Sequence, residues 1–292
     1  MKPQALAYLQ IICGAVLLSS GSAAIKATQF DAFQLAGVRA VVIVVFMAVA
    51  VRPALRFFDR RLLPAALAHA ATTVLFMLGN KLTTAAMAIF LQYTAPLYLL
   101  LLGPWLLKEP VTRRDVAYVA MLLVGMVMLL LNPPARAATA SNPVLGGIVA
   151  ACCGVTWAFT TLTMRGLARD PQAGFQRTIA SIIVANAALA LVLLPLFPPG
   201  AAARALDFGL AAYMGVLQLG TAFILVTLGL RRLTALEGTL LLLIEPVLNP
   251  IWVYFVHGET LGVWSLAGGA LILATTGARA VVNARPLKRM GI

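Results

Sequence analysis

The chain has 292 residues, of which 62% are hydrophobic and only 11% are charged, and its formal net charge is +13. Soluble domains contain about 45–50% apolar and about 25% charged residues, so this composition excludes a soluble protein and indicates an integral membrane protein. The apolar runs are continuous rather than alternating, which excludes a closed β-barrel.

Ten stretches approach or exceed the roughly 20 mostly apolar residues that a helix needs to cross a bilayer, although the third is short. In chain order they are 4–25, 32–51, 64–79, 84–107, 115–132, 143–164, 171–195, 209–231, 236–256 and 261–282. We therefore predict an all-α integral membrane protein with ten transmembrane helices. The first stretch is longer than the apolar part of a signal peptide and nine others follow it, so we interpret it as a retained helix.

Basic residues are distributed unevenly between the two ends of these helices. Of the 22 Lys and Arg residues, 16 fall on the same side of the membrane as the amino terminus, four fall on the other side, and Arg39 and Arg177 lie within spans. Such a bias marks the cytoplasmic side. We therefore predict a multi-pass protein of a bacterial-type inner membrane with both termini in the cytoplasm, whose basic segments contact membrane lipid rather than nucleic acid.

The two halves of the chain share an ordered set of matches. Pro96 aligns with Pro246 and Glu109 with Glu259, each at an offset of 150 residues, and "CGAVLL" near the start resembles "CGVTWA" at an offset of 140. A drift in offset is what loop insertions produce. The matches predict two five-helix repeats.

The repeats divide the chain into a first half over 1–135, a linker over 136–142 and a second half over 143–292 that ends in a short basic tail. Because five is an odd number, the second half must enter the membrane inverted relative to the first. Inverted repeats are the usual construction of secondary transporters, which bind their substrate near the midplane and open to alternate sides.

A proline in the fourth helix of each half is followed thirteen residues later by a glutamate, in "KEPVT" (108–112) and "GETLG" (258–262), and glycines follow in the fifth helix of each half, at Gly125 and at Gly268 and Gly269. In these features the chain resembles the drug/metabolite transporter (DMT) superfamily and its EamA branch. Within that branch its overall sequence, rather than any single motif, is most similar to the YddG-type exporters of aromatic amino acids and methyl viologen. The resemblance implies a basket of helices 1–4 and 6–9 around a central cavity, with helices 5 and 10 as outer supports.

Polar groups in the middle of a membrane span usually face the bundle interior or a wet cavity, and an aromatic ring on a cavity wall can stack a substrate. Six residues are therefore predicted to bind substrate: Gln92, Tyr93, Trp157, Gln218, Glu245 and Asn249. The alternative is hydrogen bonding between helices for the polar residues and simple packing for Trp157. Pro96, Pro246 and Pro250 remove backbone hydrogen bonds in the fourth and ninth helices and are predicted hinges.

Glu245 is the acidic residue that lies deepest in any predicted span. Three roles fit it: a carboxylate that binds the amine of a substrate, a protonated acid that exchanges its proton for substrate, or a structural partner that fixes the ninth helix. His69 could carry a proton or could be a packed neutral donor. Arg39 could extend its charge to the membrane surface, or it could pair with a carboxylate of the protein or of a substrate.

The sequence contains no cofactor motif, no nucleotide-binding loop and no metal-ligand spacing, and it lacks the HExxH and GxSxG patterns that an intramembrane enzyme would favour. We predict an alternating-access exporter of small metabolites, with amino acids carrying aromatic or apolar side chains as the substrate class. The alternative within transport is an exporter of drugs or quaternary cations. No cofactor and no obligate protein partner is predicted.

Overall fold

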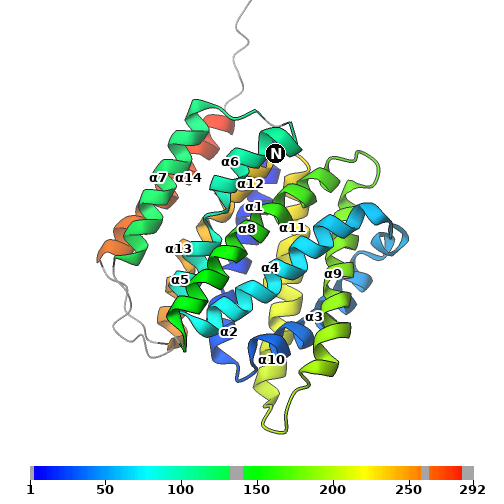
Figure 1. Ribbon diagram of the computed structural model, residues 1–292. Helices are drawn as coiled ribbons and strands as arrows, with labels where there is room; N and C mark the ends of the chain where they lie inside the picture. Colours follow the sequence, from blue (N-terminus) through cyan, green and yellow to red (C-terminus); the bar gives the residue numbers. More distant parts are fainter. Residues whose placement is uncertain (1–2, 109, 132–140, 258–262, 285–292) are drawn as a thin grey trace, which may run out of the picture.

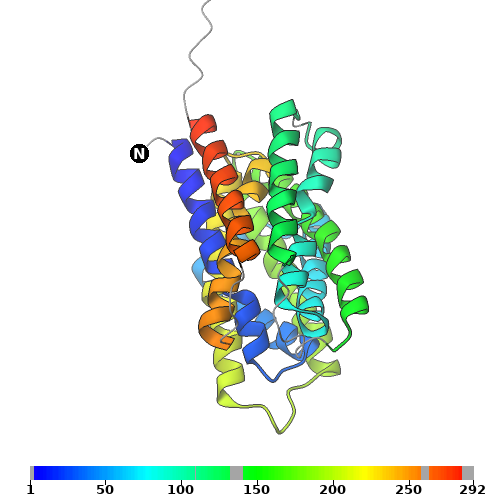
Figure 2. The same ribbon diagram turned by 90° about the vertical axis from the view of Figure 1, so that its left-hand side faces the viewer.

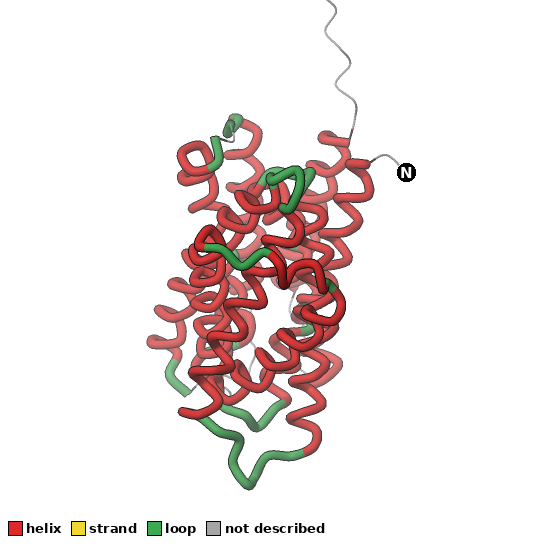
Figure 3. The backbone as a smooth tube through the Cα atoms, turned by 90° about the vertical axis from the view of Figure 1, so that its right-hand side faces the viewer, coloured by secondary structure: helices red, strands yellow, loops and turns green. Residues whose placement is uncertain are grey.

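The computed structural model describes residues 3–108, 110–131, 141–257 and 263–284. Over these residues the chain forms helices and connecting loops and no strand (Figure 3). The first half contains α1 (Pro3–Leu18), α2 (Gly21–Ala27), α3 (Ala32–Ala50), the 3-10 turns η1 (Arg52–Arg56) and η2 (Arg60–Leu62), α4 (Leu63–Leu82), α5 (Ala85–Gln92), α6 (Ala95–Leu106) and α7 (Arg113–Leu130). The second half contains α8 (Pro143–Ala168), α9 (Gly174–Leu196), α10 (Ala205–Tyr213), the π-helical η4 (Met214–Thr221), α11 (Ala222–Leu230), α12 (Ala235–Leu242), α13 (Ile244–His257) and α14 (Val263–Ala284).

Seven helical segments in the described part of the chain are long and apolar enough to cross a membrane. They are Gln4–Ala27, Ala32–Ala50, Arg60–Leu82, Pro143–Ala168, Gly174–Leu196, Ala205–Leu230 and Ala235–Val256. Each coincides with a predicted span, including the short third one, so the chain is a multi-pass membrane protein. The described parts of the predicted spans 84–107, 115–132 and 261–282 also fall on helices, but over those residues none of the three reaches that length and hydropathy. The count of ten stays a prediction.

The helices form one bundle in which segments from the two halves alternate (Figure 1). Helix α4 packs against α8, α3 against α9, and α1 against α11, so each of these contacts joins the first half to the second. Helices α7 and α14 pack against each other along one side of the bundle (Figure 1). The start of α1 and the end of α14 lie at the same end of the bundle (Figure 2).

The first predicted span is broken at Ser19 and Ser20, between α1 and α2, which the sequence analysis did not anticipate. The two residues at the break donate their hydroxyls backward along the chain, Ser19 Oγ to Val16 O at 2.6 Å and Ser20 Oγ to Leu17 O at 3.0 Å. Serine and threonine hydroxyls that bond to carbonyls in the preceding turn bend helices. Thr94 does the same at the break between α5 and α6, where its Oγ1 donates to Leu91 O at 2.7 Å.

The breaks in the fourth and ninth spans lie just before the prolines that were predicted to kink them. Pro96 is the second residue of α6 and Pro246 the third residue of α13, so each lies in the first turn of a new helix. Proline is well suited to a first turn, because the N–H that it lacks has no helical partner there. Each span therefore stops and restarts instead of bending through a continuous helix. Pro250 lies within α13.

Candidate functional site

A small cavity lies in the interior of the bundle, between the two halves. Its free volume is about 40 Å³. Its lining comes from eight helical elements and includes Leu18, Arg39, His69, Thr72, Thr73, Phe76, Gln92, Trp157, Gln218, Leu219, Phe223 and Glu245. A space of roughly 10–15 Å³ is enough for one water molecule, so this cavity can hold water but is too small for an amino acid unless its walls move apart.

Four of the six predicted binding residues line this cavity: Gln92, Trp157, Gln218 and Glu245. The structure thus brings together side chains from α5, α8, η4 and α13. The remaining two, Tyr93 and Asn249, are not among the lining residues, but both are buried and contact the broken helices around it.

Tyr93 connects the two broken spans. Its hydroxyl contacts Leu242 O at 3.1 Å and also forms a hydrogen bond with Glu245 Oε2. Leu242 O is the carbonyl that loses its helical partner because Pro246 has no N–H. The Tyr93 hydroxyl therefore lies against both the backbone carbonyl that the proline leaves without a helical partner and one carboxyl oxygen of Glu245.

Two amides satisfy the carbonyls at the break between α1 and α2. Gln218 Nε2 donates to Leu18 O at 3.2 Å, and Asn249 Nδ2 donates to Ser19 O at 2.8 Å. Trp252 Nε1 donates to Ser19 Oγ at 2.8 Å. In this conformation Asn249 therefore acts as the helix-to-helix partner that was the alternative to substrate binding, whereas Gln218 combines such a bond with a place on the cavity wall.

Aromatic rings form one wall of the cavity. Phe223 meets Trp157 edge to face at a centroid distance of 6.1 Å and His69 edge to face at 4.9 Å. Asn186 Nδ2 lies 3.3 Å from His69 Nε2, and His69 Nδ1 has no partner in the described part of the chain. These rings give the cavity an apolar face that can accommodate a ring or an aliphatic side chain.

Arg39 is the most deeply buried basic residue near the cavity, with 2% of its surface exposed. Its Nε finds no hydrogen-bond partner among the described residues. Arg177, near the start of α9, differs because it forms ion pairs with Asp170 and Asp59, which lie in loops away from the cavity. The described lining of the cavity therefore includes one guanidinium, from Arg39, and one carboxyl group, from Glu245.

Sequence analysis singled out His69 but missed the rest of the contribution of α4, and it missed that of α11. Four lining residues, His69, Thr72, Thr73 and Phe76, come from α4. Their spacing of three, one and three residues places them on one face of the helix. A stripe of this kind within an apolar span was the signal that could have revealed the wall. Phe223 offered no comparable signal, because an isolated aromatic residue in an apolar helix is unremarkable in sequence.

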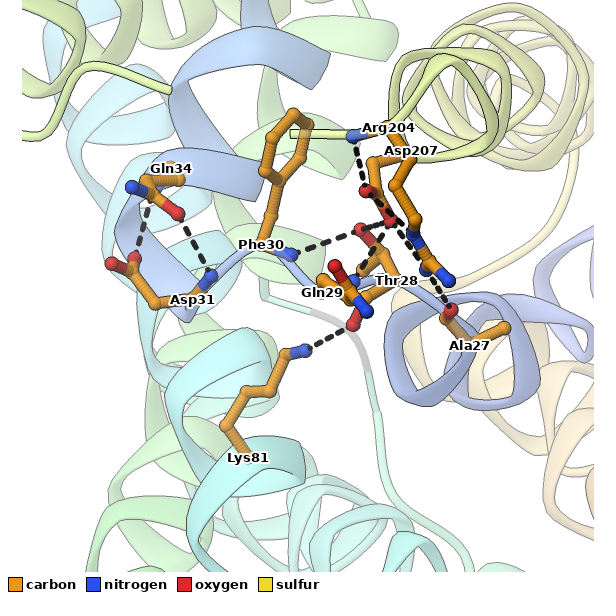
Figure 4. A network of polar contacts seen from close by, with 9 residues as sticks. All are labelled: Ala27, Thr28, Gln29, Phe30, Asp31, Gln34, Lys81, Arg204 and Asp207. Carbon is orange, nitrogen blue, oxygen red and sulfur yellow. Dashed lines mark hydrogen bonds and ion pairs between the residues drawn. The ribbon is translucent and has the colours of Figure 1, made fainter. Parts of the chain in front are cut away.

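A separate polar network closes the bundle at the end where the loop 28–31 meets the start of α10 (Figure 4). Asp207 is fully buried there. It accepts hydrogen bonds from Thr28 Oγ1 at 3.1 Å, Gln29 N at 2.8 Å, and Arg204 N, Nη2 and Nε at 2.9, 3.0 and 3.2 Å. Lys81 Nζ, from the end of α4, donates to Thr28 O at 3.0 Å. The network joins three helices of the first half to α10 of the second.

No group of three or more His, Cys, Asp or Glu residues that could hold a metal ion occurs in the described ranges. Of the cysteines, Cys153 is buried and its thiol contacts Gln92 Oε1 at 3.5 Å. Glu109 and Glu259, on which part of the repeat argument depends, lie outside the described residues.

Comparison with known proteins identifies the family. The sequence model of the EamA-like transporter family matches residues 5–131 and again 144–277. A protein of Archaeoglobus fulgidus named "Uncharacterized transporter" is 30% identical over 222 residues, which is 74% of each chain. A solved structure titled "Crystal structure of protein" superposes with a TM-score of 0.76 over 94% of this chain and 96% of the other at 22% identity, so it supports the fold alone.

These matches cover most of the chain and define it as a transporter of small molecules. The chain belongs to the EamA-like transporter family, and thereby to the DMT superfamily.

Proposed function

We propose that this protein is an alternating-access exporter of amino acids with aromatic or apolar side chains, built from two inverted five-helix halves. The observation that carries the proposal is the buried cavity between the halves, which combines a carboxyl group, a guanidinium and an aromatic wall. A free amino acid offers an ammonium group, a carboxylate and a side chain to these three features. The YddG-type exporters are the proposed nearest functional relatives.

The packing of the helices supports the inverted arrangement. An inverted repeat pairs each span of the first half with the span five places later. This operation turns the contact between α4 (span 3) and α8 (span 6) into a contact between α11 (span 8) and α1 (span 1), and both contacts occur. The contacts α3–α9 and α7–α14 each map onto themselves, as contacts across a twofold axis do. The two family matches, 5–131 and 144–277, fall on the same proposed halves.

The positive-inside bias supports an orientation with both termini in the cytoplasm of a cell bounded by an inner membrane. In that orientation the Asp207 network closes the outer end of the pathway. The cavity volume of about 40 Å³ then belongs to a contracted state, and substrate entry requires the two walls to rock apart at the breaks beside Pro96 and Pro246.

The test is transport by purified protein in proteoliposomes, comparing wild type with Glu245→Gln in the presence and absence of a pH gradient. Loss of tryptophan transport under both conditions supports binding of the substrate amine by Glu245. Loss of only the pH-driven component supports proton exchange. Unchanged transport under both conditions leaves Glu245 with a structural role, and a wild-type protein that moves no member of an amino-acid panel refutes the proposed substrate class.

An exporter of quaternary cations is the second candidate, because Glu245 with Trp157 and Phe223 also resembles a cation site. Competition between tryptophan and methyl viologen in the same vesicles distinguishes the two. An intramembrane enzyme is the remote third reading and predicts chemical turnover of a substrate, which analysis of the vesicle contents would detect.

A further inference from the structure

The cavity contains a buried positive charge, that of Arg39, which forms no ion pair with a carboxylate in the described part of the chain. Arg39 lies eight residues after the cap of α3, which places it about 12 Å along the helix. It is 2% exposed, so its side chain does not reach the membrane surface. The ion pairs found among the described residues join other groups, Arg177 with Asp59 and Asp170 and Arg204 with Asp207.

Glu245 does not neutralise this charge directly. It lines the same cavity, but its Oε2 is bonded to the Tyr93 hydroxyl, and it forms no ion pair with Arg39. A buried charge without a partner is strongly destabilising. A guanidinium cannot escape this cost by losing its proton, because it stays charged in proteins. An arginine in this position is therefore expected to meet an anion at some stage of the working cycle.

We propose that Arg39 is the anion-binding group of the central cavity and that it holds the carboxylate of the transported amino acid while Glu245 faces the ammonium group. The planar fork of a guanidinium matches a carboxylate through two parallel hydrogen bonds. The substrate is thus a zwitterion whose side chain lies against Trp157 and Phe223. This inference rests on the proposed transport function and narrows its substrate class, because an organic cation without a carboxylate leaves Arg39 unpaired.

Binding to the purified wild-type protein tests the inference without relying on transport. The probes are tryptophan, tryptamine, which lacks the carboxylate, and indole-3-propionate, which lacks the ammonium group, with thermal stabilisation in detergent as the readout. We expect tryptophan to bind at least about tenfold more tightly than tryptamine, the loss that removal of a charged hydrogen bond produces. Indole-3-propionate is expected to retain measurable binding.

The assignment of Arg39 is overturned if tryptophan and tryptamine stabilise the protein equally. It is also overturned if neither of the probes that carry a carboxylate, tryptophan and indole-3-propionate, stabilises it. Either result leaves the proposed function to be judged separately by the vesicle assay, in which transport of an amine or of methyl viologen would still establish an exporter.

Substitution of Arg39 provides the second test. We expect Arg39→Gln to weaken tryptophan binding by at least about tenfold while leaving tryptamine binding unchanged, and Arg39→Lys to retain part of the tryptophan affinity. Arg177→Gln is the matched control, because Arg177 pairs with carboxylates away from the cavity. The ligand-free thermal midpoint of Arg39→Gln should equal or exceed that of wild type, because an unpaired buried charge has been removed. An equal loss of affinity for both probes, or a marked fall in that midpoint, would indicate a purely structural arginine.

Discussion

The Tyr93 hydroxyl and the Glu245 carboxyl group, 152 residues apart in sequence, form a buried hydrogen bond beside the cavity. The same hydroxyl lies 3.1 Å from Leu242 O. A phenol has one hydrogen, so it can donate to only one of these two oxygens at a time. Both contacts are hydrogen bonds together only when Glu245 carries a proton and donates it to the Tyr93 oxygen.

This counting of hydrogens predicts an asymmetry between two conservative substitutions. Tyr93→Phe removes the shared hydroxyl and leaves Leu242 O and Glu245 without it, so we expect the free energy of unfolding to fall by about 1–3 kcal/mol. In Glu245→Gln the amide N–H still donates to the Tyr93 oxygen, and the Tyr93 hydroxyl still donates to Leu242 O. We therefore expect the free energy of unfolding to fall by less than about 1 kcal/mol. Reversible unfolding in mixed micelles measures both.

The double variant provides the control, because neighbouring residues that share a bond are not additive. Tyr93→Phe with Glu245→Gln should be no more than slightly less stable than Tyr93→Phe alone. A larger loss in Glu245→Gln than in Tyr93→Phe would contradict the shared-hydrogen arrangement and favour an ionised Glu245 that accepts from Tyr93.

Close approach of α8 to the break between α5 and α6 gives a second prediction. A Cβ atom on Gly154 would lie 2.5 Å from Leu91 O and 2.6 Å from Thr94 Oγ1, closer than real Cβ contacts allow. Gly154→Ala should therefore destabilise the protein by about 1–3 kcal/mol, as overpacking does. On the same helix, a Cβ on Gly147 meets its nearest atom at 4.0 Å. Gly147→Ala is the matched control and should be neutral or stabilising in thermal unfolding, because alanine favours helix. Equal stability of the two variants would mean that the segment between α5 and α6 shifts to accommodate the added methyl group at no cost.

Sequence reasoning located the seven apolar spans and four residues of the cavity wall, because membrane burial leaves few interpretations for a polar residue in an apolar run. Glu245, Gln92 and Gln218 stand out on that ground alone, and all three line the cavity. Sequence reasoning did not show that Tyr93 and Asn249 are buried outside the cavity lining, because depth along a helix says nothing about which neighbour a side chain faces. The break at Ser19 and Ser20 was missed because serine bends a helix only when its hydroxyl turns back to the preceding carbonyls.

The surroundings of Asp170, in the loop between α8 and α9, predict that the stability of the protein falls as the pH becomes acidic. The backbone N–H groups of Ala173 and Gln172 donate to its carboxylate at 3.2 and 2.9 Å, and these bonds, with the charge of Arg177, lower its pKa. The folded state therefore releases this proton more readily than the unfolded chain, whose Asp pKa is about 3.9. The stabilisation is fully present above that value and is lost as the pH falls through the lower folded pKa.

Asp170→Asn removes this contribution. We expect the thermal midpoint of the variant to lie below that of wild type at neutral pH and the two to converge below about pH 4. Thermal unfolding in detergent across a pH series makes the comparison. A difference that stays constant over the whole series would show that the loop depends on the shape of Asp170 and not on its charge.

The last prediction concerns the Asp207 network that joins the halves at the proposed outer end. Asp207→Asn keeps the size of the side chain but removes the charge that Arg204 and the 28–29 segment share. We expect a lower thermal midpoint and a population shifted toward an outward-open state. In a cysteine-free background with Phe76→Cys in the cavity wall, a membrane-impermeant thiol reagent added outside should then react several-fold faster. Asp31→Asn is the matched control: Asp31 lies in the same loop but caps its own helix, α3, through Phe33 N and Gln34 N, and asparagine caps helices equally well. Labelling that is unchanged by Asp207→Asn, or raised equally by Asp31→Asn, would mean that the network fixes the loop without gating the exit, because only a bond between the two moving halves can hold them closed.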